Sequence, residues 1–158
     1  MPMGFIVLSG LLVVMTVVAY QDFRYRTINL FSLIAFSGLA MYLGAQELTW
    51  QVWLMQTGIN LSFIFIQLFL ITIWFSIKEK RWTNIADQYL GWGDILFFIP
   101  IALLFNPVHF MCFYIGSLLS VLVGFLCYQM ITTNPSPTIP LAGGMAICLI
   151  FTLLFVGL

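Results

Sequence analysis

The segment Gly91-Trp92-Gly93-Asp94 places a carboxylic acid directly before an apolar run, Ile95-Leu96-Phe97-Phe98-Ile99. A charged side chain costs about 2.5–3.5 kcal/mol at the centre of a membrane helix, and less near the interface. The two glycines leave little bulk in front of Asp94, admit backbone conformations closed to other residues and allow another segment to approach. We therefore expect Asp94 to lie at the mouth of a membrane helix, beside an accessible surface.

The composition of the whole chain is that of a membrane protein. Of its 158 residues, 63% are hydrophobic and only 6% are charged, and the mean hydropathy is +1.11. Apolar runs of about 20 residues recur, each long enough to span a bilayer. Because these runs are continuous rather than alternating, helices are favoured over a barrel. The sequence predicts one all-α, membrane-embedded domain over residues 1–158 without a separate soluble domain, and its zero net charge gives no indication of nucleic-acid binding.

Six apolar runs predict a polytopic bundle of six transmembrane helices. The first run contains no Lys or Arg up to Tyr20, so it lacks the charged start of a cleaved signal peptide and is expected to be a retained span. The fourth run starts at the Gly91–Asp94 segment and ends near residue 106. The other expected spans cover residues 3–20, 29–43, 52–77, 109–131 and 139–158.

The basic residues fall on one side of this predicted bundle. The first and third connections contain every Lys and Arg of the chain: Arg24, Arg26, Lys78, Lys80 and Arg81. The positive-inside rule places these connections in the cytoplasm and both termini outside the cytoplasmic (inner) membrane. Asp22 closes the first span and Asp94 opens the fourth, so both acids are expected at the cytoplasmic boundary.

Two carboxylates that share a poorly solvated site cannot both ionise easily, so one keeps its proton while the other stays charged. Such a pair can take a proton from water and donate one to a peptide bond, which is hydrolysis without a metal or a nucleophilic side chain. The chain has one histidine, His109, predicted on the opposite side from the acids, and its three cysteines form no Cys-x-x-Cys pair. We expect no metal and no organic cofactor.

These residues resemble the motifs of the prepilin peptidase family, the type IV leader peptidases that include preflagellin peptidases. The segment Gly91–Asp94 matches the family's Gly-x-Gly-Asp motif in full. Residues 22–29 match the motif Asp-x-Arg-x-x-x-Ile-Pro-Asn at the acid, the arginine and the isoleucine, but Asn29 and Leu30 replace its proline and asparagine. Residues 139–144, Ile-Pro-Leu-Ala-Gly-Gly, are similar to the start of the family's last span.

The resemblance implies a membrane aspartic endopeptidase with Asp22 and Asp94 as catalytic residues and Arg24, Gly91 and Gly93 in support. Its substrate would be a membrane-inserted prepilin, pseudopilin or preflagellin-like protein of a pilus or secretion system. A short basic leader would be cut at the cytoplasmic face. The chain lacks the cysteine-containing cytoplasmic insertion of members that also methylate their product, so the resemblance implies no methyltransferase domain and cleavage alone.

Other functions are compatible with the same residues. Asp94 can be a helix N-cap, and Asp22 can be an interfacial acid paired with Arg24 or Arg26. The acids could also serve a small proton- or cation-coupled transporter or a non-catalytic membrane scaffold. The family usually has a lysine at the position of Leu96 and a proline at the position of Asn29. Because of these two differences, an inactive member of the family is a further alternative.

Two other features of the sequence are a further acid, Asp87, and a row of small residues in the fifth apolar run. Asp87 is a substitute partner for the pair, although its polar flanks are typical of a solvated loop. Gly116, Ser120 and Gly124 recur at four-residue spacing, which predicts close helix packing, either within the bundle or between copies in a homo-oligomer.

Overall fold

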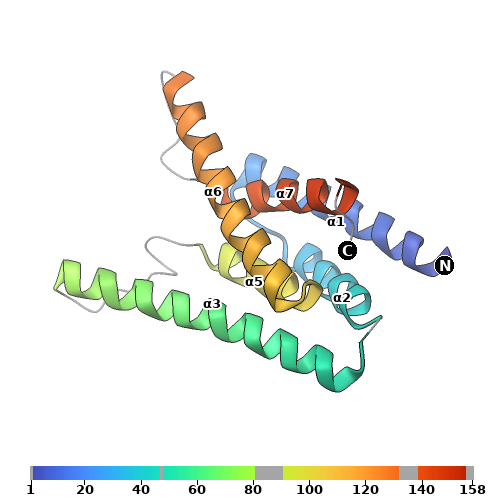
Figure 1. Cartoon of the computed structure of the whole chain (residues 1–158). Coiled ribbons are helices and arrows are strands. Elements are labelled where there is room, and N and C mark those ends of the chain that lie inside the picture. Colours follow the sequence, from blue (N-terminus) through green and yellow to red (C-terminus); the bar gives the residue numbers. More distant parts are fainter. Residues whose placement is uncertain (1, 47, 81–90, 132–138, 156–158) are drawn as a thin grey trace.

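The computed structural model describes residues 2–46, 48–80, 91–131 and 139–155, and this part of the chain is all-α, as predicted. Arg81 and Asp87 lie outside the described residues. Six helices are present in the described part (Figure 1): α1 (Pro2–Tyr25), α2 (Leu30–Ala45), α3 (Trp50–Glu79), α5 (Trp92–Leu104), α6 (Pro107–Ile131) and α7 (Leu141–Phe155).

Three of these helices are long and apolar enough to cross a membrane. The candidate spans are Ile6–Tyr25 in α1, Trp50–Glu79 in α3 and Pro107–Ile131 in α6. The helices α2, α5 and α7 are also apolar but shorter, with 16, 13 and 15 residues. Three candidate spans in one chain indicate a multi-pass membrane protein.

The core lies where α1, α2, α5 and α7 pack together. The helix α1 lies along both α7 and α2, and α5 packs mainly against α2 (Figure 1). The rings of Phe36 in α2 and Phe97 in α5 have centroids 5.4 Å apart, which joins these two helices at the centre. Fully buried apolar side chains around them include Leu11, Met15, Ile101, Phe110, Met145 and Leu149.

The carboxyl-terminal halves of α3 and α6 extend beyond this core. The buried residues of α3 end at Ile64, and those of α6 end at Ser117. Figure 1 shows the far ends of the two helices directed away from each other. Large apolar side chains there are well exposed, among them Trp74 at 68% and Met130 at 88%. An apolar surface of this extent suits contact with lipid or with another protein.

Side chains of α3 hold the carboxyl end of α5. The last carbonyls of a helix have no partner within it. Trp53 donates through Nε1 to the Leu103 carbonyl at 3.1 Å, and Asn60 donates through Nδ2 to the carbonyls of Ala102 and Phe105 at 3.0 and 2.8 Å. On the other side, a Cβ atom at Gly44 of α2 would overlap the Leu103 carbonyl oxygen. The end of α5 remote from Asp94 is therefore anchored by α3 and lies close against the Gly44 backbone of α2.

The helix α1 continues past the predicted end at residue 20. The sequence analysis placed Asp22 after the first span, but α1 runs to Tyr25 and Asp22 lies within it. The helix ends at Arg26, where the backbone turns left-handed with φ of 56° and the amide donates to the Asp22 carbonyl. The side chain of Gln21 stabilises this turn, since its Oε1 accepts a hydrogen bond from the Asn29 amide at 3.0 Å.

Candidate functional site

Asp22 lies on the last turn of α1 with its side chain directed into the protein. Only 7% of its surface is exposed, although its sequence neighbours Phe23 and Arg24 are exposed. Its Oδ2 atom accepts a hydrogen bond of 2.6 Å from the backbone N–H of Gly143 in α7. Asp22 is therefore a buried acid rather than an exposed one. The Arg26 charge still lies close enough to act on the carboxylate.

Asp94 lies on the first turn of α5, and its carboxylate also contacts α7. Its Oδ1 atom accepts a hydrogen bond of 3.0 Å from the backbone N–H of Ala142. The interpretation of Asp94 as the N-cap is wrong, because Gly91 occupies that position. The amides of Asp94 and Ile95 both donate to the Gly91 carbonyl. The Asp94 carboxylate therefore contacts both the Gly91 backbone N–H at the start of α5 and the Ala142 N–H of the neighbouring helix.

The two carboxylates thus meet at the amino terminus of α7. Ala142 and Gly143 are consecutive residues in its first turn, where N–H groups have no partner within the helix. Asp22 and Asp94 satisfy these two donors from two different helices. The partial positive charge of a helix amino terminus favours nearby anions, and the two acids are near enough for their charges to interact. The arrangement brings together the two acids that the sequence singled out.

Gly143 permits the closest contact of the site. A Cβ atom there would lie 2.9 Å from Oδ2 of Asp22 and 3.1 Å from its Cβ. Any larger residue would push Asp22 or the α7 terminus out of position. Residues 139–144 resemble the start of a family span, but their sequence did not predict this contact. The feature of the sequence that could have indicated this contact is the pair Gly143-Gly144 at the start of an apolar run.

The predicted supporting residues Gly91, Gly93 and Arg24 differ in their contacts with the rest of the site. Gly93 packs against Ile28, and a Cβ atom at Gly93 would lie 3.4 Å from Ile28 Cδ1. Gly91 has φ of −65° and ψ of 144°, a conformation open to most residues, so the backbone there does not itself require glycine. Arg24 is exposed and, within the described residues, makes no hydrogen bond to either carboxylate.

The other residues considered for chemistry lie apart from the pair. His109 is exposed at the start of α6, where it is bonded to Asn106. Cys112 and Cys127 are exposed, and Cys148 is partly buried. Among residues 2–46, 48–80, 91–131 and 139–155, no three His, Cys, Asp or Glu side chains are grouped as metal ligands would be.

The hydrogen bonds to α7 use one oxygen of each carboxylate. The Asp94 carboxylate also accepts a hydrogen bond from the Gly91 backbone N–H, and the charges of the two acids interact, so the pair can exchange protons with a bound water. Comparisons of the chain with protein-family models, curated proteins and solved structures found no match.

Proposed function

We propose that the chain is a membrane aspartic endopeptidase of the prepilin peptidase type, with Asp22 and Asp94 as its catalytic pair. The observation that supports this most strongly is the convergence of the two carboxylates on consecutive N–H groups of α7. Acids near membrane boundaries are functional candidates by default, because their burial is costly. Two of them on separate helices, turned toward one short segment, form the pair that peptide hydrolysis needs.

In the proposed reaction, the pair carries one proton. The ionised carboxylate takes a proton from water while the water oxygen bonds to the scissile carbonyl carbon, and the protonated carboxyl donates to the carbonyl oxygen. The carbon–nitrogen bond then breaks as the pair delivers its proton to the departing nitrogen and takes one back from a hydroxyl of the tetrahedral carbon, which becomes the new carboxyl group. The products are a new carboxyl terminus and a new amino terminus, and the pair is left with one proton. The two acids act as a unit, so neither has a fixed separate role.

The membrane placement in this proposal is a six-span bundle with the catalytic pair at the cytoplasmic face and both termini outside. Arg24, Arg26, Lys78 and Lys80 are exposed at the ends of α1 and α3, which supports this orientation by the positive-inside rule. The 13 residues of α5 span about 20 Å, less than the hydrocarbon core of about 30 Å. A helix this short suits an acid recessed below the membrane surface.

The proposed substrate is a membrane-inserted prepilin, pseudopilin or preflagellin-like protein. Its basic leader would remain in the cytoplasm, and its apolar helix would lie in the membrane. The scissile bond between them would reach the depth of Asp22 and Asp94 without leaving the bilayer boundary. Cleavage at this boundary would release the leader to the cytoplasm.

A structural role is the main alternative, because the two acids already cap α7. In a scaffold, Asp22 and Asp94 would only fasten α1 and α5 to α7. Asparagine is nearly as good as aspartate at accepting such hydrogen bonds, but it cannot transfer a proton. A transporter is less well supported, since its acids are expected near the membrane midplane, and both acids here lie at helix ends.

The test is cleavage of a co-expressed prepilin-like substrate by the wild type, Asp22→Asn and Asp94→Asn. We expect the wild type to cut and each variant to lose at least about a hundredfold in rate, the range of general acid–base catalysis. Asp87→Asn serves as the control and should cut normally.

Near-normal cleavage by Asp22→Asn or Asp94→Asn would contradict the pair, and loss of cleavage in Asp87→Asn would redirect attention to Asp87. A folded wild type that cuts none of several prepilin-like substrates would favour the scaffold, the transporter or an inactive member.

A further inference from the structure

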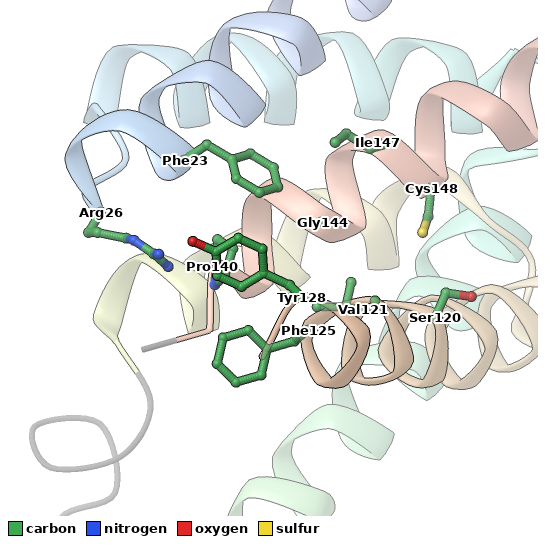
Figure 2. Close-up of a pocket in the computed structure, with 11 residues that line it drawn as sticks. Phe23, Arg26, Ser120, Val121, Phe125, Tyr128, Pro140, Gly144, Ile147 and Cys148 are labelled. Atoms are coloured by element: carbon green, nitrogen blue, oxygen red, sulfur yellow. The ribbon is translucent and has the colours of Figure 1, made fainter. Parts of the chain in front are cut away.

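A pocket of about 490 Å³ lies beside the carboxylate pair, between α1, α6 and α7. Figure 2 shows Phe23 at the end of α1 and Arg26 just after it on one side, the side chains of Val121, Phe125 and Tyr128 from α6 on the other, and Gly144 of α7 between them. Most of the lining is apolar. The pocket occupies the region where α6 extends beyond the core and contributes no buried residue.

Two residues that line the pocket directly follow residues of the candidate site in the sequence. Phe23 directly follows Asp22, and Gly144 directly follows Gly143, whose N–H binds the Asp22 carboxylate. A segment lying in the pocket would therefore pass next to the carboxylate pair. The pocket and the carboxylate pair are thus neighbours, because both are built on the end of α1 and the start of α7.

Glycine on α6 keeps the pocket open. A Cβ atom at Gly124 would have no described atom within 4 Å, and the same holds for Gly116. The predicted close packing of these glycines within the bundle is therefore wrong for the described residues. Gly124 lines the pocket, whereas Gly116 lies two turns earlier on the same helix and does not.

The charge of the pocket distinguishes the two flanks of the proposed substrate. Its described lining contains one cation, Arg26, and no acidic side chain. The apolar walls favour hydrophobic side chains, and the lining offers no acid to bind a basic leader. The leader is then left on the side of Asp94, and the apolar segment on the side of Phe23.

We infer, on the basis of the proposed peptidase function, that this pocket binds the apolar segment that follows the scissile bond. Val121, Gly124, Phe125 and Ile147 are then specificity-determining residues. The pocket fixes the direction of the substrate as well as its position. The basic leader lies outside it.

The first test compares two glycine variants of α6, Gly124→Leu and Gly116→Leu. Both add the same side chain, and both replace a poor helix former by a good one. We expect Gly124→Leu to lower kcat/KM for the prepilin-like substrate by at least about tenfold through KM, as changes of volume in apolar pockets do. Gly116→Leu should cut like the wild type. Equal activity of the two variants would overturn the inference.

The second test does not depend on activity, because it uses crosslinking in the Asp94→Asn background. Cys148 lines the pocket, whereas Cys127 is exposed on α6 outside it. Two proteins are prepared that retain one of these cysteines, with the remaining cysteines changed to serine. Each is oxidised with a substrate that has a single cysteine, placed either shortly after the scissile bond or in the leader.

We expect a disulfide between Cys148 and the apolar segment, and none between Cys148 and the leader or between Cys127 and either position. Crosslinking of Cys148 to the leader, or no crosslink at all, would overturn the inference. So would protection of Cys148 from maleimide by phospholipid alone, which would make a lipid the occupant. A Cys148 crosslink between two copies of the chain without substrate would make a second copy the occupant.

The two tests separate this inference from the proposed function. If the wild type cuts but Gly124→Leu is normal and Cys148 does not crosslink, the peptidase stands and the pocket assignment fails. If Cys148 crosslinks to the apolar segment but the wild type cuts nothing, the pocket is a binding groove and the peptidase proposal fails.

Discussion

At the scale of single residues, the site depends on how closely α7 approaches Asp22. The Gly143 amide lies 2.6 Å from Oδ2 of Asp22, and this distance requires a residue without a side chain. The Asp94 contact with Ala142 is longer, at 3.0 Å, and tolerates a methyl group on the donor residue. The position of Asp22 is therefore the more sensitive of the two to changes in α7.

We predict that Gly143→Ala disrupts the pair. The added methyl group would force Asp22 or the α7 terminus aside, and overpacking of this kind costs about 1–3 kcal/mol. We expect loss of cleavage and a lower melting temperature in detergent. Gly10→Ala is the control, because its Cβ atom would make an ordinary contact of 3.9 Å with Leu39. Wild-type behaviour of Gly143→Ala would show that the contact with Asp22 is not essential.

The stabilising role of Asp22 can be separated from its chemistry by comparing Asp22→Asn with Asp22→Ala. Asparagine retains an oxygen that can accept from the Gly143 amide, whereas alanine leaves that donor without its partner, which typically costs about 1 kcal/mol at a helix N-cap. We expect near-normal melting for the asparagine variant and a lower melting temperature for the alanine variant, with no cleavage by either. Cleavage by the asparagine variant would point to a structural role alone.

At the scale of the helices, the two ends of α5 have different tasks. Its carboxyl end is fastened to α3 by Trp53 and Asn60, and its amino end presents Asp94 to α7. The existence and apolar character of α5 were predictable from its sequence. Its partners were not, because the pattern of an apolar helix does not reveal which neighbour satisfies its terminal carbonyls.

We predict that Asn60→Ala weakens the anchoring of α5. The change removes the donor for the Ala102 and Phe105 carbonyls, and interhelical hydrogen bonds of membrane proteins are worth about 0.6 kcal/mol on average. Two lost bonds should lower the melting temperature measurably. Thr72→Val is the matched control on α3, since the Thr72 hydroxyl donates to Leu68 of the same helix. An equal effect of both changes would contradict the anchoring role.

The end of α1 was also predicted wrongly from the sequence. The change from apolar to polar residues after Tyr20 predicted a loop, but hydropathy marks the edge of an apolar run rather than the end of a helix. Two of the polar residues that continue α1 contact other parts of the protein. Asp22 binds α7, and Gln21 binds the turn before α2.

At the scale of the whole molecule, the sequence predicted the all-α class and the membrane character, because composition and run length determine both. It also placed Asp22 and Asp94 at one end of the fold, through the alternation of helices. It could not predict that α7 would bind both acids, since this contact depends on packing between helices far apart in the sequence. The projecting halves of α3 and α6 were likewise not predictable from hydropathy, because an apolar helix can face either a protein core or lipid.

The proposed orientation predicts which connections face the cytoplasm. In a variant with all three cysteines replaced, Lys80→Cys should react with an impermeant maleimide only after the cells are permeabilised. Leu48→Cys, in the connection at the other end of α3, should react in intact cells. The reverse pattern would invert the topology, and labelling of both positions from the same side would show that α3 does not cross the membrane.

The measurement that tests the central claim most directly is the cleavage rate of the double variant Asp22→Asn/Asp94→Asn beside both single variants. Residues that act as one catalytic unit show non-additive losses, because the first substitution already removes the function of the unit. We predict that each single variant loses as much activity as the double variant. Losses that multiply in the double variant, with substantial cleavage left in either single one, would show that the two carboxylates do not work as a pair.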